Sequence, residues 1–423
     1  DLPNIPQAHL EYACKDSATT LQIAMIQKKK ITNKLFNVYR TIDLPVMWTV
    51  MDFQGFAVDT DKWVKLSETN AARAEKIKEK LPFNPLSPSQ VKSYLSKTGF
   101  PRLMSTEEDT LEKFIKRYPD TEAAQIGAIE LEYRKYHKRS STYGKNWIEK
   151  YIEIEAGIPM LFGDYHTIGA ETGRFSCTSP NMQNIPTRDT KEFRECFVAR
   201  PGNKLIIADY SQQEIGIVAY ISGDKAMIDM FNTGKDAYIM MAKLMYGKDI
   251  DKKDPLRARM KTVVLAANYG MSAKGLARKE DISEDEADDA LRRLRKSFPG
   301  LVSWMGMQQR KKVKTETVSG RITWLNPYSE QCDRNALNNP IQGTASDMLK
   351  MALSEIHRQW KFDFPFAVVA AIHDEIVLDV PAISAKEVAK FVQNIMVKVA
   401  NDMLPGMKFR ASACIGNNWS EKD

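Results

Sequence analysis

FAVVAAIHDEIVLDV, residues 366–380, contains two apolar runs rich in β-branched side chains on either side of His373, Asp374 and Glu375. This composition predicts two buried strands joined by a tight turn. An ionised carboxylate between core strands costs on the order of several kcal/mol unless a partner compensates its charge. A divalent cation is the simplest partner for two adjacent carboxylates. A polar hairpin tip that faces water is the alternative, and this stretch alone does not decide between the two.

A second carboxylate favours the metal site. KLIIAD, residues 204–209, is another short apolar run, and it ends in Asp209. If its strand lies beside those of 366–380 in one sheet, Asp209 and Asp374 converge on a shared site. Hard oxygen ligands favour Mg²⁺, which keeps several waters and takes substrate phosphate oxygens as further ligands. Two such ions about 3.5–4 Å apart are the arrangement used in two-metal phosphoryl transfer.

Length and composition limit the classes of protein that fit. With 423 residues, 43% of them apolar, the chain is long enough for roughly three domains of ordinary size. Its net charge of +7 suits a polyanionic partner, although many soluble proteins are as basic. The five cysteines are scattered without a CxxC pair, which argues against a disulfide framework or a zinc site and for a reducing compartment.

Targeting signals are not visible in the chain. No apolar run approaches the ~18 residues that a membrane-spanning helix needs, and no signal peptide is recognisable. The chain begins at Asp1 without a methionine. We therefore expect a fragment or a processed product, and organellar targeting upstream of Asp1 stays open.

Two polar segments have the composition of nucleic-acid contacts. Residues 133–145, YRKYHKRSSTYGK, mix cations, aromatic rings and hydroxyls, a mixture that suits contacts with phosphates and sugars. Residues 171–186, ETGRFSCTSPNMQNIP, are rich in polar side chains that can hydrogen-bond groove edges and sugars. The alternatives are a solvated, charged helix end for the first segment and an ordinary polar loop for the second.

A helical stretch carries a stripe of candidate substrate contacts. Four side chains recur every four residues: Arg257, Lys261, Leu265 and Tyr269. On an α-helix this spacing gives one slightly drifting face, along which a triphosphate could lie at the cationic end with sugar and base toward the aromatic end. Lys261 could neutralise charge that develops on the leaving phosphates. Taken alone, the stretch is better interpreted as an amphipathic helix with apolar core positions and solvated cations.

In this order, these pieces resemble family A DNA polymerases, the group of bacterial DNA polymerase I and related phage enzymes. The similar segments are the TGRFSCTSPNMQNIP loop, DYSQQE at 209–214 (motif A), RARMKTVVLAANYG at 257–270 (motif B), RNALNNPIQGTASD at 334–347 and HDE at 373–375 (motif C). They cover essentially residues 45–423. YACKD at 12–16 is similar to the last motif of the family's 3′–5′ exonuclease domain, whose other motifs are absent here. Asp16 alone cannot hold an exonuclease metal pair, so we expect no proofreading by this chain.

The resemblance implies an α+β fold with a right-hand polymerase architecture, in which the palm contains an antiparallel sheet and the fingers and thumb are helical. The expected divisions are 1–45, the C-terminal remnant of an exonuclease-like domain and a linker; 46–62, a palm-entry segment; 63–155, the thumb; 156–224, the first part of the palm with motif A; 225–330, the fingers with motif B; and 331–423, the second part of the palm with motif C.

The resemblance also implies roles for single residues. The expected catalytic residues are Asp209, Asp374, Glu375 and Lys261. Two Mg²⁺ ions, with Mn²⁺ as a substitute, would be held by Asp209, Asp374 and the backbone of Tyr210. The expected dNTP contacts are Arg257, Lys261, Leu265, Tyr269, Glu214, Gln212 and His373. The expected DNA contacts are Arg174, Asn181, Gln183, Asn184, Arg334, Asn338, Gln342, Lys138 and Arg139.

Two of these positions carry a specific expectation, and a third position departs from the family. Glu214 falls where the family's steric gate fills the space that a ribose 2′-hydroxyl would need. Leu265 stands where the family usually has Phe or Tyr, and we hypothesise strong rejection of dideoxynucleotides because no tyrosine hydroxyl can replace their missing 3′-hydroxyl. Gln213 replaces the apolar residue common after DYSQ, with an effect that the sequence does not predict.

The function expected from the resemblance is template-directed addition of dNTPs to a primer 3′ end by two-metal phosphoryl transfer, in replication or repair. A single-subunit RNA polymerase is the first alternative, and Glu214 and Glu375 argue against it. A non-catalytic nucleic-acid-binding protein of the same fold is the second, which the retained metal and triphosphate ligands disfavour. A metal nuclease is the third, and Asp16 lacks a second acidic cluster nearby.

The expected partners follow from the same resemblance. They are primer–template DNA, dNTPs and a processivity factor or other replisome proteins, with no membrane. We expect a monomer in the cytoplasm of a bacterial or phage-infected cell.

Overall fold

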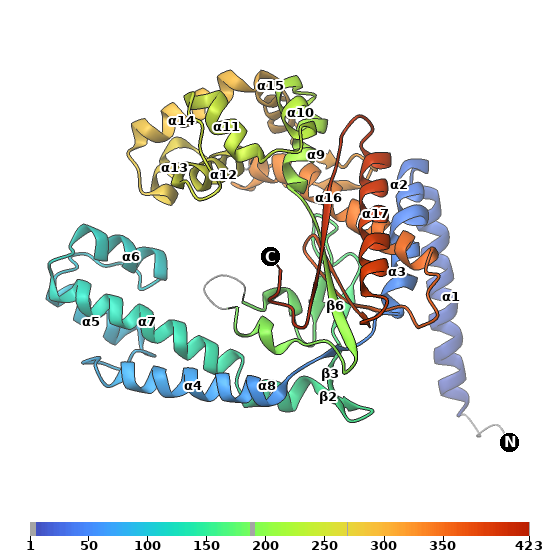
Figure 1. Ribbon diagram of the computed structural model, residues 1–423, viewed down its shortest axis with the longest axis horizontal. Coiled ribbons are helices and arrows are strands. Elements are labelled where there is room, and N and C mark those ends of the chain that lie inside the picture. The colour runs from blue at the N-terminus through green and yellow to red at the C-terminus, as the bar shows by residue number, and fades with distance from the viewer. Residues whose placement is uncertain (1–5, 187–190, 269, 423) are drawn as a thin grey trace.

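A four-stranded antiparallel sheet lies at the centre of the molecule, in strand order β11-β6-β10-β9. The structure is a computed structural model that describes residues 6–186, 191–268 and 270–422. The strands are β6 (Asn203–Tyr210), β9 (Val368–Ile372), β10 (Glu375–Pro381) and β11 (Ala411–Gly416). Both strands expected in 366–380 are therefore confirmed, and β6 (labelled in Figure 1) is paired with β10.

The described residues also form three smaller antiparallel sheets. The first has the order β1-β3-β2, with β1 (Phe56–Ala57), β2 (Ile152–Glu155) and β3 (Ile158–Leu161). The others are hairpin-like pairs: β4 (Asp164–His166) with β5 (Ser176–Thr178), and β7 (Lys314–Glu316) with β8 (Ile322–Trp324). Together with the abundant helices they make the fold class α+β, as predicted.

One group of helices extends away from the sheet with cores of its own (Figure 1). It consists of α4 (Thr60–Lys78), α5 (Pro88–Thr98), α6 (Glu108–Arg117), α7 (Glu122–Thr142) and α8 (Lys145–Tyr151). Its outer part is built around Val91, Leu95 and Phe100, and Ile77 and Tyr133 pack between α4 and α7. Separate cores are typical of units that can move relative to one another.

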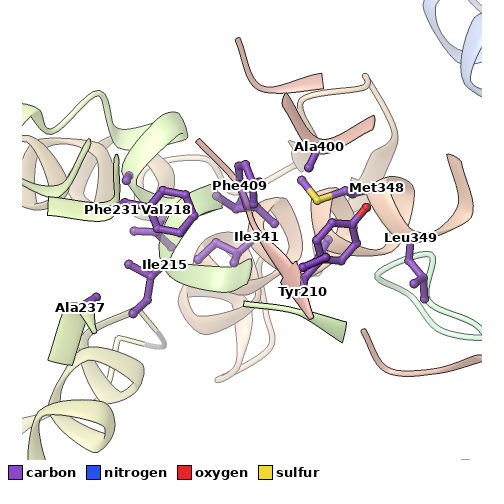
Figure 2. Close-up of a cluster of buried hydrophobic side chains, with 14 of the residues drawn as sticks. Tyr210, Ile215, Val218, Phe231, Ala237, Ile341, Met348, Leu349, Ala400 and Phe409 are labelled. Atoms are coloured by element: carbon purple, nitrogen blue, oxygen red, sulfur yellow. The ribbon is translucent and has the colours of Figure 1, made fainter. Parts of the chain in front are cut away.

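A second helical group shares its core with the sheet. It consists of α9 (Gln213–Ser222), α10 (Lys225–Asn232), α11 (Ala237–Tyr246), α12 (Pro255–Asn268), α13 (Ala273–Glu280), α14 (Glu284–Ser297) and α15 (Pro299–Gln309). Figure 2 shows Ile215 and Val218 of α9 in one cluster with Tyr210 of β6 and with Phe231 and Phe409. This shared core fixes the base of the second group to the strand that carries Asp209.

The two helical groups meet at a polar contact. Lys116 of α6 and Asp281, which follows α13, form an exposed ion pair with an N–O distance of 2.9 Å. An exposed pair of this kind contributes on the order of 0–1 kcal/mol. The contact therefore holds the two helical groups together only weakly.

The remaining helices back the sheet or precede it. Long helix α16 (Cys332–Arg358) and α17 (Ala385–Met403) pack on the sheet. The N-terminal elements are α1 (Gln7–Lys30), α2 (Asn33–Val38), the π-helix η1 (Tyr39–Asp43) and α3 (Leu44–Met51). Short 3₁₀ turns η2 (Met182–Asn184) and η3 (Arg194–Cys196) precede β6. Within the described ranges, no helix combines the length and apolar character needed to cross a membrane.

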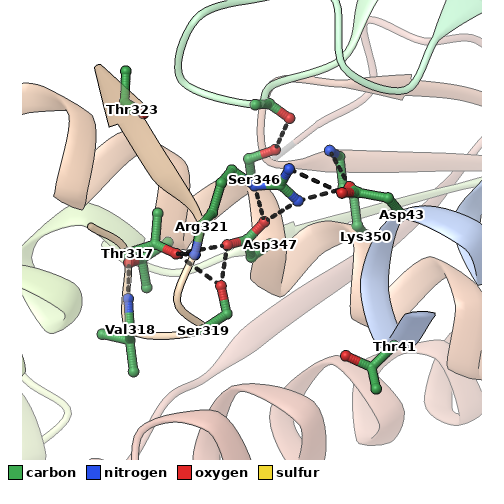
Figure 3. Close-up of polar contacts among 12 residues, drawn as sticks. Thr41, Asp43, Thr317, Val318, Ser319, Arg321, Thr323, Ser346, Asp347 and Lys350 are labelled. Carbon is green, nitrogen blue, oxygen red and sulfur yellow. Dashed lines mark hydrogen bonds and ion pairs between the residues drawn. The ribbon is translucent and has the colours of Figure 1, made fainter. Parts of the chain in front are cut away.

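A buried ionic network joins the β7–β8 hairpin, η1 and α16 (Figure 3). Arg321 binds Asp43 of η1 at 2.7 Å and Asp347 of α16 at 2.7 Å. Lys350 of α16 lies 3.3 Å from the same Asp43 carboxylate, so two cations balance two carboxylates. Ser346, next to Asp347, donates a hydrogen bond of 2.8 Å to the carbonyl oxygen of Gly173. The network thus supports the loop that presents Arg174.

Candidate active site

The register of the central sheet brings three carboxylates together. Glu375 is the residue directly opposite Asp209 in the antiparallel β6–β10 pair. Asp374 precedes Glu375 in the two-residue turn between β9 and β10, where His373 has φ of 59°. A first turn residue with positive φ is what a tight two-residue hairpin requires. The strands expected to be neighbours are paired, and Asp374 is close enough to Asp209 to act on it electrostatically; a shared metal site stays a prediction.

Burial dominates the electrostatics of Asp209. Desolvation, followed by the charge of Asp374, raises the pKa of Asp209 to about 7, although Lys422 acts in the opposite direction. Its Oδ1 atom is buried and has no hydrogen-bond partner. An unpartnered carboxylate oxygen in a group of acidic side chains suits a hard divalent cation.

The donor set fits the expected metal with few protein ligands. Among the described residues, no three His, Cys, Asp or Glu side chains converge as ligands around one point. The set predicted from the sequence contains only two carboxylates, Asp209 and Asp374, and the backbone carbonyl of Tyr210. Mg²⁺ accepts such a set because waters and substrate phosphates complete its coordination.

Three side chains that sequence reasoning missed surround Glu375. Lys422 Nζ lies 2.6 Å from Asp209 Oδ2 and 2.8 Å from Glu375 Oε2. Trp419 donates its indole N–H to Glu375 Oε1, and an Arg194 nitrogen lies 3.9 Å from the same oxygen. Burial lowers the pKa of Lys422, but Glu375 and Asp209 outweigh it and hold that pKa above its usual range.

The candidate gate residue lies beside a candidate DNA contact. Glu214, in the first turn of α9, is 3.7 Å from an Arg174 nitrogen. Arg174 also acts on His373, whose pKa is lowered by desolvation first and then by this nearby cation. Arg174 thus forms an ion pair with Glu214 and acts electrostatically on His373, which stands next to Asp374 in the chain.

Gln212 is engaged within the protein. It has a left-handed backbone conformation at the start of α9. Its Oε1 atom accepts a hydrogen bond of 3.0 Å from the backbone N–H of Ala237, at the start of α11. This contact ties α9 to α11, and a role of Gln212 toward dNTP stays a prediction.

Helix α12 carries the predicted stripe on one face. Arg257 donates two hydrogen bonds to Asp236, at 2.9 and 2.7 Å. Lys261 is exposed and Leu265 is half-buried. Tyr269 lies outside the described residues. The helix therefore offers one paired cation, one exposed cation and one partly covered aliphatic side chain along the same side.

A groove between α7 and the 180–186 loop gathers several candidate DNA contacts. Its volume is about 1230 Å³, and its lining includes Lys138, Arg139, Asn181 and Asn184. The groove also contains Lys135 and Tyr143, which belong to the segment 133–145 singled out from the sequence, and Asn146 and Lys150, which sequence reasoning did not single out. Asn146 and Lys150 lie on α8, directly after that segment, and this closeness in sequence was the available signal.

The other candidate DNA contacts point in different directions. Gln183 donates its side-chain N–H to the carbonyl oxygen of Phe175 at 3.0 Å. On α16, Arg334 is exposed, whereas Asn338 and Gln342 are half-buried. The four-residue spacing puts these three on one helix face, and the Asn338 Oδ1 atom is buried without a hydrogen-bond partner.

Comparison with known proteins identifies the group to which these features belong. A family model described as DNA polymerase family A matches residues 60–421. DNA polymerase I of Chloroflexus aurantiacus is 29% identical over 445 residues, which cover 97% of this chain and 46% of that protein. The thermostable DNA polymerase I of Thermus aquaticus is 29% identical over 417 residues, covering 91% of this chain and 48% of that protein.

A solved structure supports the same comparison. The POL domain of Pol1 from M. smegmatis, in complex with DNA primer-template and dNTP, is similar with a TM-score of 0.80 and 28% sequence identity. The match covers 90% of this chain and 70% of that one. The chain spans about half the length of the curated relatives it matches.

Proposed function

The chain belongs to DNA polymerase family A, and from that premise we propose that it catalyses template-directed addition of dNTPs to the 3′ end of a primer. The observation that carries the proposal is the facing pair Asp209 and Glu375 with Asp374 in the adjoining turn. The M. smegmatis relative was solved with primer-template and dNTP, and the same ligands are proposed here.

The acidic group supplies the reaction centre. Asp209, Asp374 and the backbone carbonyl of Tyr210 would hold Mg²⁺, with Mn²⁺ as a substitute. When bound, two such ions supply activation of the primer 3′-oxygen and charge stabilisation at the leaving pyrophosphate. Glu375 supports this site from the opposite strand, and its two oxygens are kept in place by Trp419 and Lys422.

The α12 stripe binds the triphosphate. Lys261, which is exposed, places a point charge on the phosphates, and Arg257 offers the donors that Asp236 leaves available. Leu265, one turn further along, packs against the incoming sugar. The role at the templating position that the resemblance implies for Tyr269 stays a prediction, since this residue lies outside the described ranges. Rotation of α12 toward the sheet would close the site on a correctly paired dNTP and supply specificity by induced fit.

The DNA path follows the two polar surfaces. The groove beside Lys138 and Arg139 binds the primer–template backbone, in the range 63–155 that we propose as the thumb. Arg174 and the α16 residues Arg334, Asn338 and Gln342 contact the minor groove close to the reaction centre. The range 225–330 forms the fingers, and the ranges 156–224 and 331–423 form the palm.

We also propose that this chain does not proofread. Asp16, in the YACKD segment, lies exposed on α1, a helix with no buried residue. YACKD is the one segment of the chain that is similar to a motif of the family's exonuclease domain, and Asp16 alone cannot hold a metal pair. A mismatched primer end should therefore persist when no dNTP is supplied.

The test is extension of a primed DNA template with Mg²⁺ and either dNTPs or rNTPs, by the wild type and by Asp374→Ala. Asp402→Ala, at an exposed ion pair on α17, is the matched control. We expect extension with dNTPs by the wild type and the control and loss of extension in Asp374→Ala, with primer–template binding retained in all three. Equal activity of Asp374→Ala, or preferential use of rNTPs, would contradict the proposal. Binding without any extension would favour a non-catalytic nucleic-acid-binding protein.

A further inference from the structure

The last residues of the described chain form a fixed strap rather than a loose tail. We define the C-terminal strap as residues 417–422, which follow β11. Trp419 at its centre is fully buried and packs against Phe197 with ring centroids 5.2 Å apart. The Trp419 backbone N–H also bonds the Phe197 carbonyl oxygen at 2.9 Å. Glu421 accepts a bond of 2.9 Å from the Asn417 backbone N–H, which closes a turn just before Lys422.

The strap delivers an ammonium group into the acidic site. Lys422 Nζ bonds one oxygen of Asp209 at 2.6 Å and one of Glu375 at 2.8 Å. These distances are those of charge-assisted hydrogen bonds. The two carboxylates face each other across β6 and β10, so Lys422 bridges the two strands from the side of the strap.

The two oxygens of Asp209 differ in their partners. Oδ2 is bonded to Lys422, whereas Oδ1 is buried without a partner. A cation bound to Oδ1 would lie only a few ångströms from the Lys422 ammonium, which is bonded to the other oxygen of the same carboxylate. Two cations at such a distance repel each other strongly in a partly buried site.

We propose that Lys422 is a built-in counter-cation, which holds Asp209 and Glu375 together without a divalent ion and competes with that ion for Asp209. This inference deepens the proposed function, on which it rests for the role of the metal. Binding of a hard divalent cation across Asp209 and Asp374 requires Lys422 to withdraw from Oδ2. Lys422 is one third exposed, so it can swing toward solvent while Trp419 keeps the strap in place.

Two measurable consequences follow for the protein without DNA or nucleotide. Removal of the ammonium should tighten binding of a divalent ion, because the competing charge is lost. It should also lower the thermal stability of the metal-free protein, because Asp209, Asp374 and Glu375 then repel one another without compensation. An arginine at this position should keep both properties close to those of the wild type.

The test uses Mn²⁺ as the probe, with free Mn²⁺ followed by electron paramagnetic resonance. The proteins are the wild type, Lys422→Met, Lys422→Arg and Lys398→Met, a control that removes an exposed lysine of α17. We expect Lys422→Met to bind Mn²⁺ about tenfold more tightly, which corresponds to about 1.4 kcal/mol, and the other two variants to match the wild type. In EDTA, Lys422→Met should unfold at a lower temperature than the control.

Several results would overturn the inference. They are unchanged or weaker Mn²⁺ binding by Lys422→Met, an equal effect in Lys398→Met, and no Mn²⁺ binding by any of the proteins. Primer extension by the wild type separates this inference from the proposed function. Extension together with an unchanged Mn²⁺ affinity refutes the counter-cation alone, whereas the expected Mn²⁺ shift without extension refutes the polymerase activity and leaves the competition between the cations in place.

Discussion

Asp236 accepts two hydrogen bonds from Arg257, both on its Oδ2 atom, at 2.9 and 2.7 Å. Its other oxygen, Oδ1, accepts bonds from the backbone N–H groups of Tyr238 and Ile239 at the start of α11. Asp236 is therefore fixed to one helix and orients the guanidinium of the next. The contact also fixes the direction of the Arg257 N–H groups that are not bonded to Asp236.

The first prediction concerns this orientation. Asp236→Ala should raise KM for dNTP several-fold with a smaller effect on kcat, because Arg257 keeps its charge and loses its direction. Arg257→Ala should give the larger rise in KM. Steady-state extension with varied dNTP measures both, and an unaltered KM in Asp236→Ala would mean that Arg257 needs no such support.

The second prediction uses the raised pKa of Asp209, about 7 against about 3.9 for an ordinary aspartate. Between these values the folded protein binds more protons at Asp209 than the unfolded chain, so stability falls as pH rises through that window. Asp209→Asn cannot ionise, so its stability does not fall with pH for this reason. In EDTA, the variant should unfold at a higher temperature than the wild type at pH 8, and the difference should vanish near pH 4. If the unfolding temperatures of the two proteins differ by the same amount from pH 4 to pH 8, the raised pKa does not belong to Asp209.

The third prediction concerns Glu214, the proposed gate. Glu214→Ala should increase ribonucleotide incorporation by at least about tenfold, since a steric exclusion is lost. Glu214→Gln is the matched variant, because it keeps the size of the side chain and removes the charge that faces Arg174 at 3.7 Å. We expect it to exclude ribonucleotides nearly as well as the wild type. An equal increase in ribonucleotide incorporation by both variants would mean that the ion pair with Arg174, and not the size of the Glu214 side chain, excludes ribonucleotides.

The fourth prediction concerns Leu265, which is half-buried on α12. The wild type should strongly prefer dTTP to ddTTP, and Leu265→Tyr should narrow this preference by about tenfold, the worth of one hydrogen bond of about 1–1.5 kcal/mol. Leu265→Phe is the control, since it adds the ring without the hydroxyl. Competition between the two nucleotides on one template gives the ratio. Equal incorporation of ddTTP and dTTP by the wild type would refute the hypothesis.

The sequence predicts the strands of the site but not their register. The apolar runs and the acidic residues beside them are visible locally, which is why β6, β9 and β10 could be expected. The pairing partner of Asp209 depends on the register between β6 and β10, two strands far apart in the sequence, and a slip of one residue would move every side chain to the other face. The structure pairs Asp209 with Glu375 and leaves Asp374 in the turn, a detail that composition does not contain.

The direction of polar side chains is also beyond the reach of sequence. Gln183 and Asn184 are adjacent and similar in chemistry, yet Gln183 bonds the Phe175 carbonyl oxygen and Asn184 lines the groove beside α7. Lys422 illustrates the same limit over a longer range. A single lysine near the end of the chain belongs to no periodic pattern, and its place between Asp209 and Glu375 follows from the packing of Trp419.

The last prediction concerns the buried network of Arg321, Asp347, Asp43 and Lys350. Asp347 is fully buried and accepts bonds from Arg321, Thr317 and Ser319. Asp347→Ala leaves the buried Arg321 and Lys350 with a single carboxylate, so the free energy of unfolding should fall by about 3–5 kcal/mol. The matched control is Asp333→Ala on the same helix, whose exposed pair with Lys312 should leave the unfolding midpoint nearly unchanged. Because Ser346 ties this region to Gly173, Asp347→Ala should also weaken primer–template binding through Arg174. Denaturant unfolding and DNA-binding titrations measure the two effects, and a loss of stability without any loss of DNA binding would restrict the network to a purely structural role.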